Sequence, residues 1–358
     1  MTLTRFQPGD IVIKSEKSTI STWTDNQNNL QSQFTSSTQA IYSSQTSSGN
    51  YYVDVYNKDP QTDTTAEVQF SCAYGHKNGS GSLDFTNDTG SFGLSTSRAT
   101  YSQYRQLVYG EETQNFVFGT HEPDDIYVLN IQRKNYKQNL KPGSLSIYIT
   151  GSTPPVGGHS IGGVKLTDDS VTNPNATLTN AGRQFNLVSG SLGILSGSTI
   201  QQRGGSASYG FVYPDAGFII INPDAFYSSS AANNSNIFSQ VYPNRTPNDA
   251  GNSTPNTKRL QLAVSGGAHF IVDSEEKITS RYFFVRARNG EYNHSNNPTF
   301  TDDQGNLYWD SMIDSPRTFI TTVGLYNDNN DLVAVAKLSQ PIAKDPTKEA
   351  LIRVKLDF

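Results

Sequence analysis

Cysteine, tryptophan, methionine and charged residues are scarce in this chain of 358 residues, which has one cysteine, two tryptophans, two methionines and 16% charged residues. The single cysteine, Cys72, cannot form a disulfide within the chain and has no cysteine partner for a metal site. This cysteine usage is typical of a protein that folds in a reducing cytoplasm.

Long apolar runs and basic runs are also missing. No stretch approaches the roughly 18 apolar residues that a membrane-spanning helix needs, and residues 1–17 lack the apolar region of a secretion signal. The net charge is −5, and no run of lysine or arginine forms the basic patch of a nucleic-acid-binding protein. The sequence therefore predicts no membrane-spanning segment and no nucleic-acid partner.

Serine, threonine, asparagine and aromatic residues are abundant instead, with 19 tyrosines and 18 phenylalanines. The small polar residues are poor helix formers that hydrogen-bond to nearby backbone in turns. Aromatic residues at this frequency argue against a disordered chain. We therefore expect a mainly β fold with α+β character, built from antiparallel sheets.

Residues 1–150 are predicted to form an N-terminal α+β domain. One helix is expected near residues 98–109, with Ser97 as its N-cap and Gly110 just after its end. Tyr101, Tyr104, Leu107 and Val108 share one face of it at helical spacing. Alternating or continuous apolar residues predict strands at 10–14, 51–56, 65–74, 115–118, 126–131 and 145–149.

Residues 151–257 are predicted to form a long, irregular, loop-rich β insertion, because glycine, proline and polar tracts separate its apolar pieces. Short strands are expected at 184–188, 194–195 and 218–221. The tracts at 228–239 and 244–256 contain too few apolar residues to offset the cost of ordering their backbone. We expect these two tracts to be mobile in the free protein and ordered by partners.

Residues 258–358 are predicted to form a C-terminal antiparallel β domain. Residues 281–288 alternate, with Phe283, Val285 and Ala287 facing one way. Residues 319–326 and 332–338 predict a hairpin whose turn is the Asn- and Asp-rich segment 327–331. In the last strand Ile352, Val354, Leu356 and Phe358 should face the core, with Arg353, Lys355 and Asp357 outside.

The sharpest catalytic motif is Gly158-His159-Ser160-Ile161-Gly162, which matches G-x-S-x-G. A nucleophile elbow needs a buried strand before the serine and a helix after it, and neither flank has that pattern. The five histidines lie far apart in the sequence, and the carboxylate doublets lie beside turn signals. We therefore predict a protein that is not an enzyme, with no catalytic residue, metal site or cofactor.

Three C-terminal stretches carry a resemblance to a known family: YFFVRARNGEYNHSNNPTF, FITTVGLYNDNNDLVAVAKLSQPIAKD and EALIRVKLDF. They resemble virion structural proteins of contractile-tailed phages, with the closest likeness to T4-like myoviruses that infect cyanobacteria. The segments YSQYRQLVYGEETQNFVFG and DIYVLNIQRKNYKQNLKPGSLSIYI are similar to the same family. Together these segments cover a little under half of the chain.

The resemblance implies a non-enzymatic component of the virion, in the baseplate or elsewhere in the tail, synthesised in the host cytoplasm. Its partners would be other virion structural proteins, in a homo- or hetero-oligomer within the tail. Two alternatives stay open: a receptor- or polysaccharide-binding adhesin of the virion, and a neck- or head-associated structural protein. Arginine and large aromatic residues are enriched at interfaces, so we select Tyr308, Trp309, Arg353 and Lys355 as interface residues. For Arg353 and Lys355, the alternative is that they only solvate the sheet.

Overall fold

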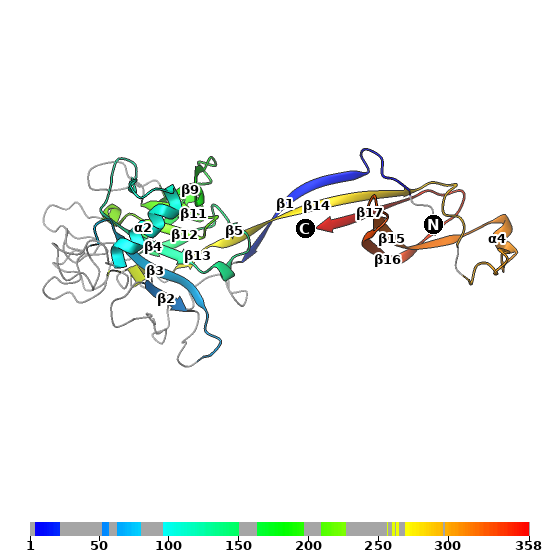
Figure 1. Ribbon diagram of the computed structural model, residues 1–358, viewed down its shortest axis with the longest axis horizontal. Helices are drawn as coiled ribbons and strands as arrows, with labels where there is room; N and C mark the ends of the chain where they lie inside the picture. Colours follow the sequence, from blue (N-terminus) through cyan, green and yellow to red (C-terminus); the bar gives the residue numbers. More distant parts are fainter. Residues whose placement is uncertain are drawn as a thin grey trace. The chain divides into compact units, whose positions relative to one another are not determined.

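Strands dominate the part of the chain that the computed structural model describes (Figure 1). The residues it describes are 4–21, 52–56, 63–79, 96–149, 163–196, 209–226, 256, 260–261, 263–264, 269–295 and 298–357. The polar tract at 228–239, most of the tract at 244–256 and the G-x-S-x-G motif at 158–162 lie outside these residues.

The chain divides into two compact units. The large unit comprises residues 18–276, and the small unit combines residues 1–17 with residues 277–358. These bounds differ from the three consecutive domains expected from composition, since the N-terminal segment joins the C-terminal one. Antiparallel sheets dominate both units, as the sequence predicts.

The large unit is built on one antiparallel sheet that curls into a half-barrel. Its strands in spatial order are β13 (Phe270–Ile271), β6 (Ser146–Ile149), β7 (Val164–Asp168), β9 (Gly182–Ser191), β11 (Gly210–Tyr213), β12 (Phe218–Ile221), β4 (Asp125–Ile131), β3 (Val68–His76) and β2 (Tyr52–Tyr56). The short strands β8 (Thr177–Thr179) and β10 (Ile194–Leu195) pair with β9. Strands from residues 163–226, within the predicted insertion, therefore lie inside the same sheet as β3, β4 and β6.

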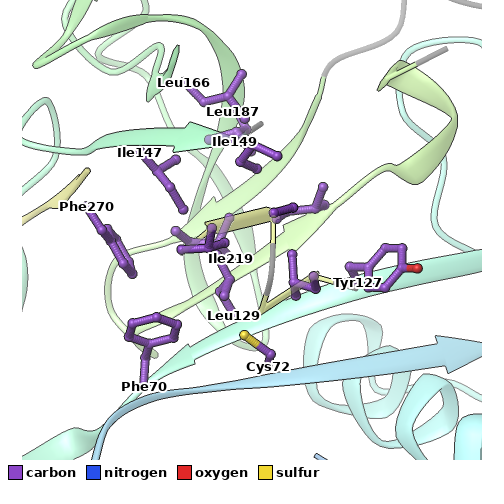
Figure 2. Close-up of a cluster of buried hydrophobic side chains, with 14 of the residues drawn as sticks. Phe70, Cys72, Tyr127, Leu129, Ile147, Ile149, Leu166, Leu187, Ile219 and Phe270 are labelled. Atoms are coloured by element: carbon purple, nitrogen blue, oxygen red, sulfur yellow. The ribbon is translucent and has the colours of Figure 1, made fainter. Parts of the chain in front are cut away.

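Both faces of the central strands are buried. On β4, Leu129 faces one apolar cluster and Val128 faces the other, and on β12 Ile219 and Ile220 divide in the same way. Figure 2 shows the first cluster, in which Leu129 lies near Ile219 and the free cysteine, Cys72. Two-sided burial accounts for the nearly continuous apolar sequence of these strands.

Helix α2 (Thr96–Tyr109) covers the second face of the sheet, and Tyr101, Tyr104 and Val108 are buried against it. Gly110 ends the helix as predicted: its φ is +73° and its N–H donates to the carbonyl of Gln106.

Two details of the helix prediction are wrong. Leu107 is 44% exposed, because it lies at the margin of the apolar stripe. Ser97 lies inside the first turn instead of capping it, since the helix begins at Thr96. Residues 95–97 are Ser, Thr and Ser, so their side-chain types alone do not locate the cap.

The segment 115–118 is not a strand, although its apolar residues predicted one. It contributes a single bridge between Phe118 and His121, which closes a tight turn. Phe116 and Phe118 are nevertheless fully buried beneath α2, with the Tyr101 ring in edge contact with Phe116. Burial without strand pairing gives the same apolar sequence signal as a strand.

A polar cluster fixes one edge of the large unit. Arg183 forms an ion pair with Asp215 (Nη2–Oδ1 2.6 Å) and lies 3.7 Å from Glu275, which accepts a hydrogen bond from Asn139. The bond to Arg183 holds the pKa of Asp215 below its usual range despite burial, which acts in the opposite direction. Asn139 belongs to β5 (Asn139–Leu140), so the cluster links four segments distant in sequence.

The small unit packs two sheets around a thin core. One contains β1 (Ile11–Ser21), β14 (Asp273–Ala287) and β17 (Ala350–Asp357), and the other is the hairpin of β15 (Thr318–Tyr326) and β16 (Leu332–Lys344). The predicted alternation is confirmed, because Phe283, Val285, Ile352, Val354 and Leu356 all belong to the core. Phe358 lies outside the described residues.

The predicted hairpin turn is confirmed. The Asn327 side-chain oxygen accepts the N–H groups of Asn329 and Asp331, and Asn330 has φ +66°. At the other end of β16, the buried Lys344 ammonium donates to the Asn289 and Asp345 carbonyls and the Asn293 side chain. This lysine ties the segment after β14 to the end of the hairpin.

Truncating the core of the large unit should cost much of its stability. Leu129→Ala removes a fully buried side chain from β4, and we expect the free energy of unfolding to fall by about 2–5 kcal/mol. The matched control is Leu178→Ala, which removes a side chain that is 80% exposed and should change it by less than about 0.5 kcal/mol. Urea denaturation measures both, and equal effects would contradict two-sided burial.

Two tyrosines of α2, Tyr104 and Tyr109, predict a loss of stability in alkali. Burial raises the pKa of Tyr104 and of Tyr109 from 10.0 to about 12, because it disfavours the charged phenolate. Their contribution is fully present below pH 10.0 and is lost as the pH rises through about 12, since the unfolded chain releases these protons first. Thermal unfolding across this interval should show the loss, and Tyr104→Phe should reduce the pH dependence.

Candidate functional site: exposed surfaces of the small unit

The two units differ in how many of their apolar side chains are buried and how many are exposed. Among the described residues, the small unit contributes only six of the buried apolar ones, namely Ala287, Val323, Leu325, Ala350, Ile352 and Val354. Of the 21 exposed large apolar residues in the described part of the chain, the small unit carries 13 and the large unit carries eight. Exposed apolar surface gathered in one part of a chain marks an interaction site.

The first exposed surface is the aromatic loop, defined here as Tyr308, Trp309 and Ile313. These side chains are 58%, 63% and 64% exposed, respectively. They lie beside and within the short helix α4 (Ser311–Asp314), where the N–H of Met312 donates to the Trp309 carbonyl (2.9 Å). Two of the four predicted interface residues therefore lie in one local cluster.

The backbone leading into the aromatic loop is held by hydrogen bonds. The Asp302 carboxylate accepts the N–H groups of Gln304 (3.0 Å) and Asn306 (2.7 Å), and a bridge joins Thr301 to Leu307. The side-chain bond from Asn306 is the main cause that lowers the pKa of Asp302. The loop thus presents its apolar side chains from a bonded turn.

The second exposed surface is the outer face of the hairpin, defined here as Phe319, Tyr326, Leu332 and Val335. Val323 and Leu325 point to the opposite, core side. A Cβ added at Gly324 would lie 3.0 Å from Tyr326 Cε2 and 3.2 Å from Leu332 Cδ1, so these side chains lie over the glycine. A larger residue at position 324 would require these two exposed side chains to shift by a few tenths of an ångström.

The third surface is charged and contains the other two predicted residues. Arg353 and Lys355 lie near the ring of Tyr282, with the Arg353 Cζ 5.6 Å and the Lys355 Nζ 5.9 Å from its centroid. Lys355 also pairs with Asp357 (Nζ–Oδ1 3.1 Å), which accepts a bond from Ser280 Oγ (2.6 Å). Both cations thus have partners within the chain, and they lie on β17, away in sequence from the aromatic loop.

Two histidine contacts in the large unit involve groups used in catalysis elsewhere. His269 Nε2 lies 2.8 Å from Ser146 Oγ, and Ser146 Oγ lies 2.8 Å from Ser191 Oγ. Burial is the main cause that lowers the pKa of His269, with Lys165 acting in the same direction. Ser146 is fully buried within a paired strand, so we interpret this contact as a structural link.

The second contact joins His121 Nε2 to Asp224 Oδ2 (2.8 Å). It links the turn after Phe118 to the 3-10 turn η4 (Pro223–Phe226). Both histidine contacts join residues more than 100 positions apart, and for that reason spacing in the sequence did not reveal them.

Metal and membrane features are not found in the part of the chain that the structure describes. Its His, Cys, Asp and Glu side chains form no group of three or more that could hold a metal ion. Within those same residues, no helix is long and apolar enough to cross a bilayer.

Comparison with known proteins gives no match to a protein-family model, to a curated protein or to a solved structure. The geometry of the surfaces above therefore carries the functional argument together with the sequence.

The aromatic loop should be dispensable for folding. Trp309→Ala removes a side chain that is mostly exposed, and we expect the free energy of unfolding to change by less than about 0.5 kcal/mol. Ile352→Ala, which opens the thin core, should cost about 2 kcal/mol or more. Denaturant titration of both variants tests this, and a large cost for Trp309→Ala would mean that the ring packs within the chain.

Proposed function

We propose that this chain is a structural component of a contractile-tailed phage virion, placed in the baseplate or elsewhere in the tail. It acts through protein–protein assembly. The observation that carries the proposal is the concentration of exposed apolar side chains on the small unit, which has few buried ones. Partner subunits that cover these side chains would remove apolar surface from water, the main favourable term in association.

The C-terminal resemblance supports the same proposal, since its three stretches fall in the small unit. Neighbouring subunits would also supply the contacts that order the polar tracts at 228–239 and 244–256, because these tracts contain few apolar residues of their own. A neck- or head-associated position is the alternative within the same structural role.

An adhesin of the same virion is the second candidate, and the aromatic loop favours it. Tyr308 and Trp309 are adjacent and exposed, and aromatic faces of this kind stack on the apolar faces of sugars. In that case the isolated protein would bind a defined glycan. Trp309→Ala would then abolish that binding without altering the fold.

The proposal is tested on particles purified from the phage that encodes the chain. We expect mass spectrometry to find the chain in intact virions and antibody labelling to mark the tail, because an assembled component remains with the particle. A glycan array with the isolated protein is the companion measurement. Absence from purified particles would refute the structural role, and glycan binding that depends on Trp309 would favour the adhesin.

A further inference from the structure

Strand β1 forms one edge of its sheet in the small unit. Among the strands that the structure describes, it pairs with β14 alone, and the N–H of Phe284 donates to the carbonyl of Asp10 at the start of this pairing. The residues of β1 between Ile11 and Ser15 are all exposed. A long exposed edge strand can hydrogen-bond to a strand of another chain.

The charges on β1 form a self-complementary pattern. Lys14 and Glu16 are two residues apart, so they point to the same face of the strand, where their side chains pair at 2.8 Å. An antiparallel pairing of β1 with a copy of itself about an axis at Ser15 would place Lys14 opposite Glu16 of the second copy. The same axis would place Glu16 opposite Lys14 of the second copy, giving a square of four alternating charges.

We propose that β1 of this chain pairs antiparallel with β1 of a second copy, with the two-fold axis at Ser15. The inference names one partner for the assembly role and rests on that proposed function. A symmetric pairing uses the same patch on both subunits, the commonest arrangement in homo-oligomers. Directly opposite side chains have Cβ atoms about 4.5–5.5 Å apart, close enough for the opposite charges to attract.

The charge pattern selects this register over its neighbours. An axis at Lys14 would place two ammonium groups opposite each other, and an axis at Glu16 would do the same with two carboxylates, which is unfavourable. Strand β17, on the other edge, has a similar pair at Lys355 and Asp357. That pair lies at the end of the strand, so the corresponding axis would join only its last residues.

The other face of β1 agrees with the same register. Ile13 is 61% exposed, and the axis at Ser15 would place it opposite Lys17 of the second copy. The methylene stem of a lysine covers apolar surface while its ammonium group stays in water. The pairing would therefore shield both copies of Ile13.

Charge reversal provides the test. Sedimentation of the full chain over a wide concentration range should show a monomer–dimer equilibrium. Lys14→Glu and Glu16→Lys should each weaken it by about tenfold or more, because each places like charges opposite each other twice. An equimolar mixture of the two variants should dimerise again, since the two carboxylates of the first variant would face the two ammonium groups of the second.

The mixture separates the contact between copies from the ion pair within one copy. Each single variant lacks the internal Lys14–Glu16 pair, so only pairing between copies can restore association in the mixture. Lys348→Glu is the matched control, because Lys348 is an exposed lysine paired with Asp345 (3.2 Å) away from β1. This control should dimerise like the unaltered chain, and circular dichroism should show the same fold in all variants.

Three results would overturn the inference: a chain that stays monomeric at all concentrations, single reversals that leave the dimer intact, or a mixture that fails to associate. These outcomes are distinguishable from failure of the proposed function. A monomeric chain found in purified virions refutes the β1 pairing and leaves the structural role standing. If the chain forms charge-dependent dimers but is missing from purified virions, the β1 pairing stands and the structural role is refuted.

Discussion

Burial on both faces of the central strands is the constraint on which the large unit depends. Each residue of β4 from Ile126 to Leu129 belongs to one of the two apolar clusters, and the polar residues of the strand, Asp125 and Asn130, lie outside this run. Helix α2 and the aromatic residues beneath it complete one face, and β6, β7 and β13 curl around the other. Because both faces are covered, segments distant in sequence must all be in place before the sheet is shielded from water.

The small unit follows a different rule. Its strands alternate, with one face toward a thin core and one face outside, so each strand contributes half of its side chains to burial. Several of the outward positions are nonetheless apolar, on the hairpin and in the aromatic loop. A unit of this kind gains stability from covering its outer surfaces, which links its folding energetics to the assembly role proposed for it.

All four candidate interface residues are exposed, and their contacts within the chain divide them into two pairs. Tyr308 and Trp309 are apolar and lie together, whereas Arg353 and Lys355 are engaged with Tyr282 and Asp357 on β17. A cation with partners within its own chain gains less from a new contact than an uncovered aromatic ring does. The sequence identifies these four residues as types that are common at interfaces. Their neighbours in the folded chain decide which of them have side-chain surface left for a partner.

Local pattern determined the features that a short stretch of sequence specifies by itself. The hairpin with its Asn-rich turn, the alternation of β14 and β17, and the end of α2 at Gly110 all follow from side-chain periodicity and turn chemistry. Only the tertiary structure decided that residues 163–226 join the main sheet, that 1–17 joins 277–358, and that Phe116 is buried without strand pairing. The contacts of Ser146 with His269 and of His121 with Asp224 are likewise tertiary, since their partners lie more than 100 residues apart. Sequence periodicity indicates which side chains of an element are buried. Tertiary packing determines which other segments they contact.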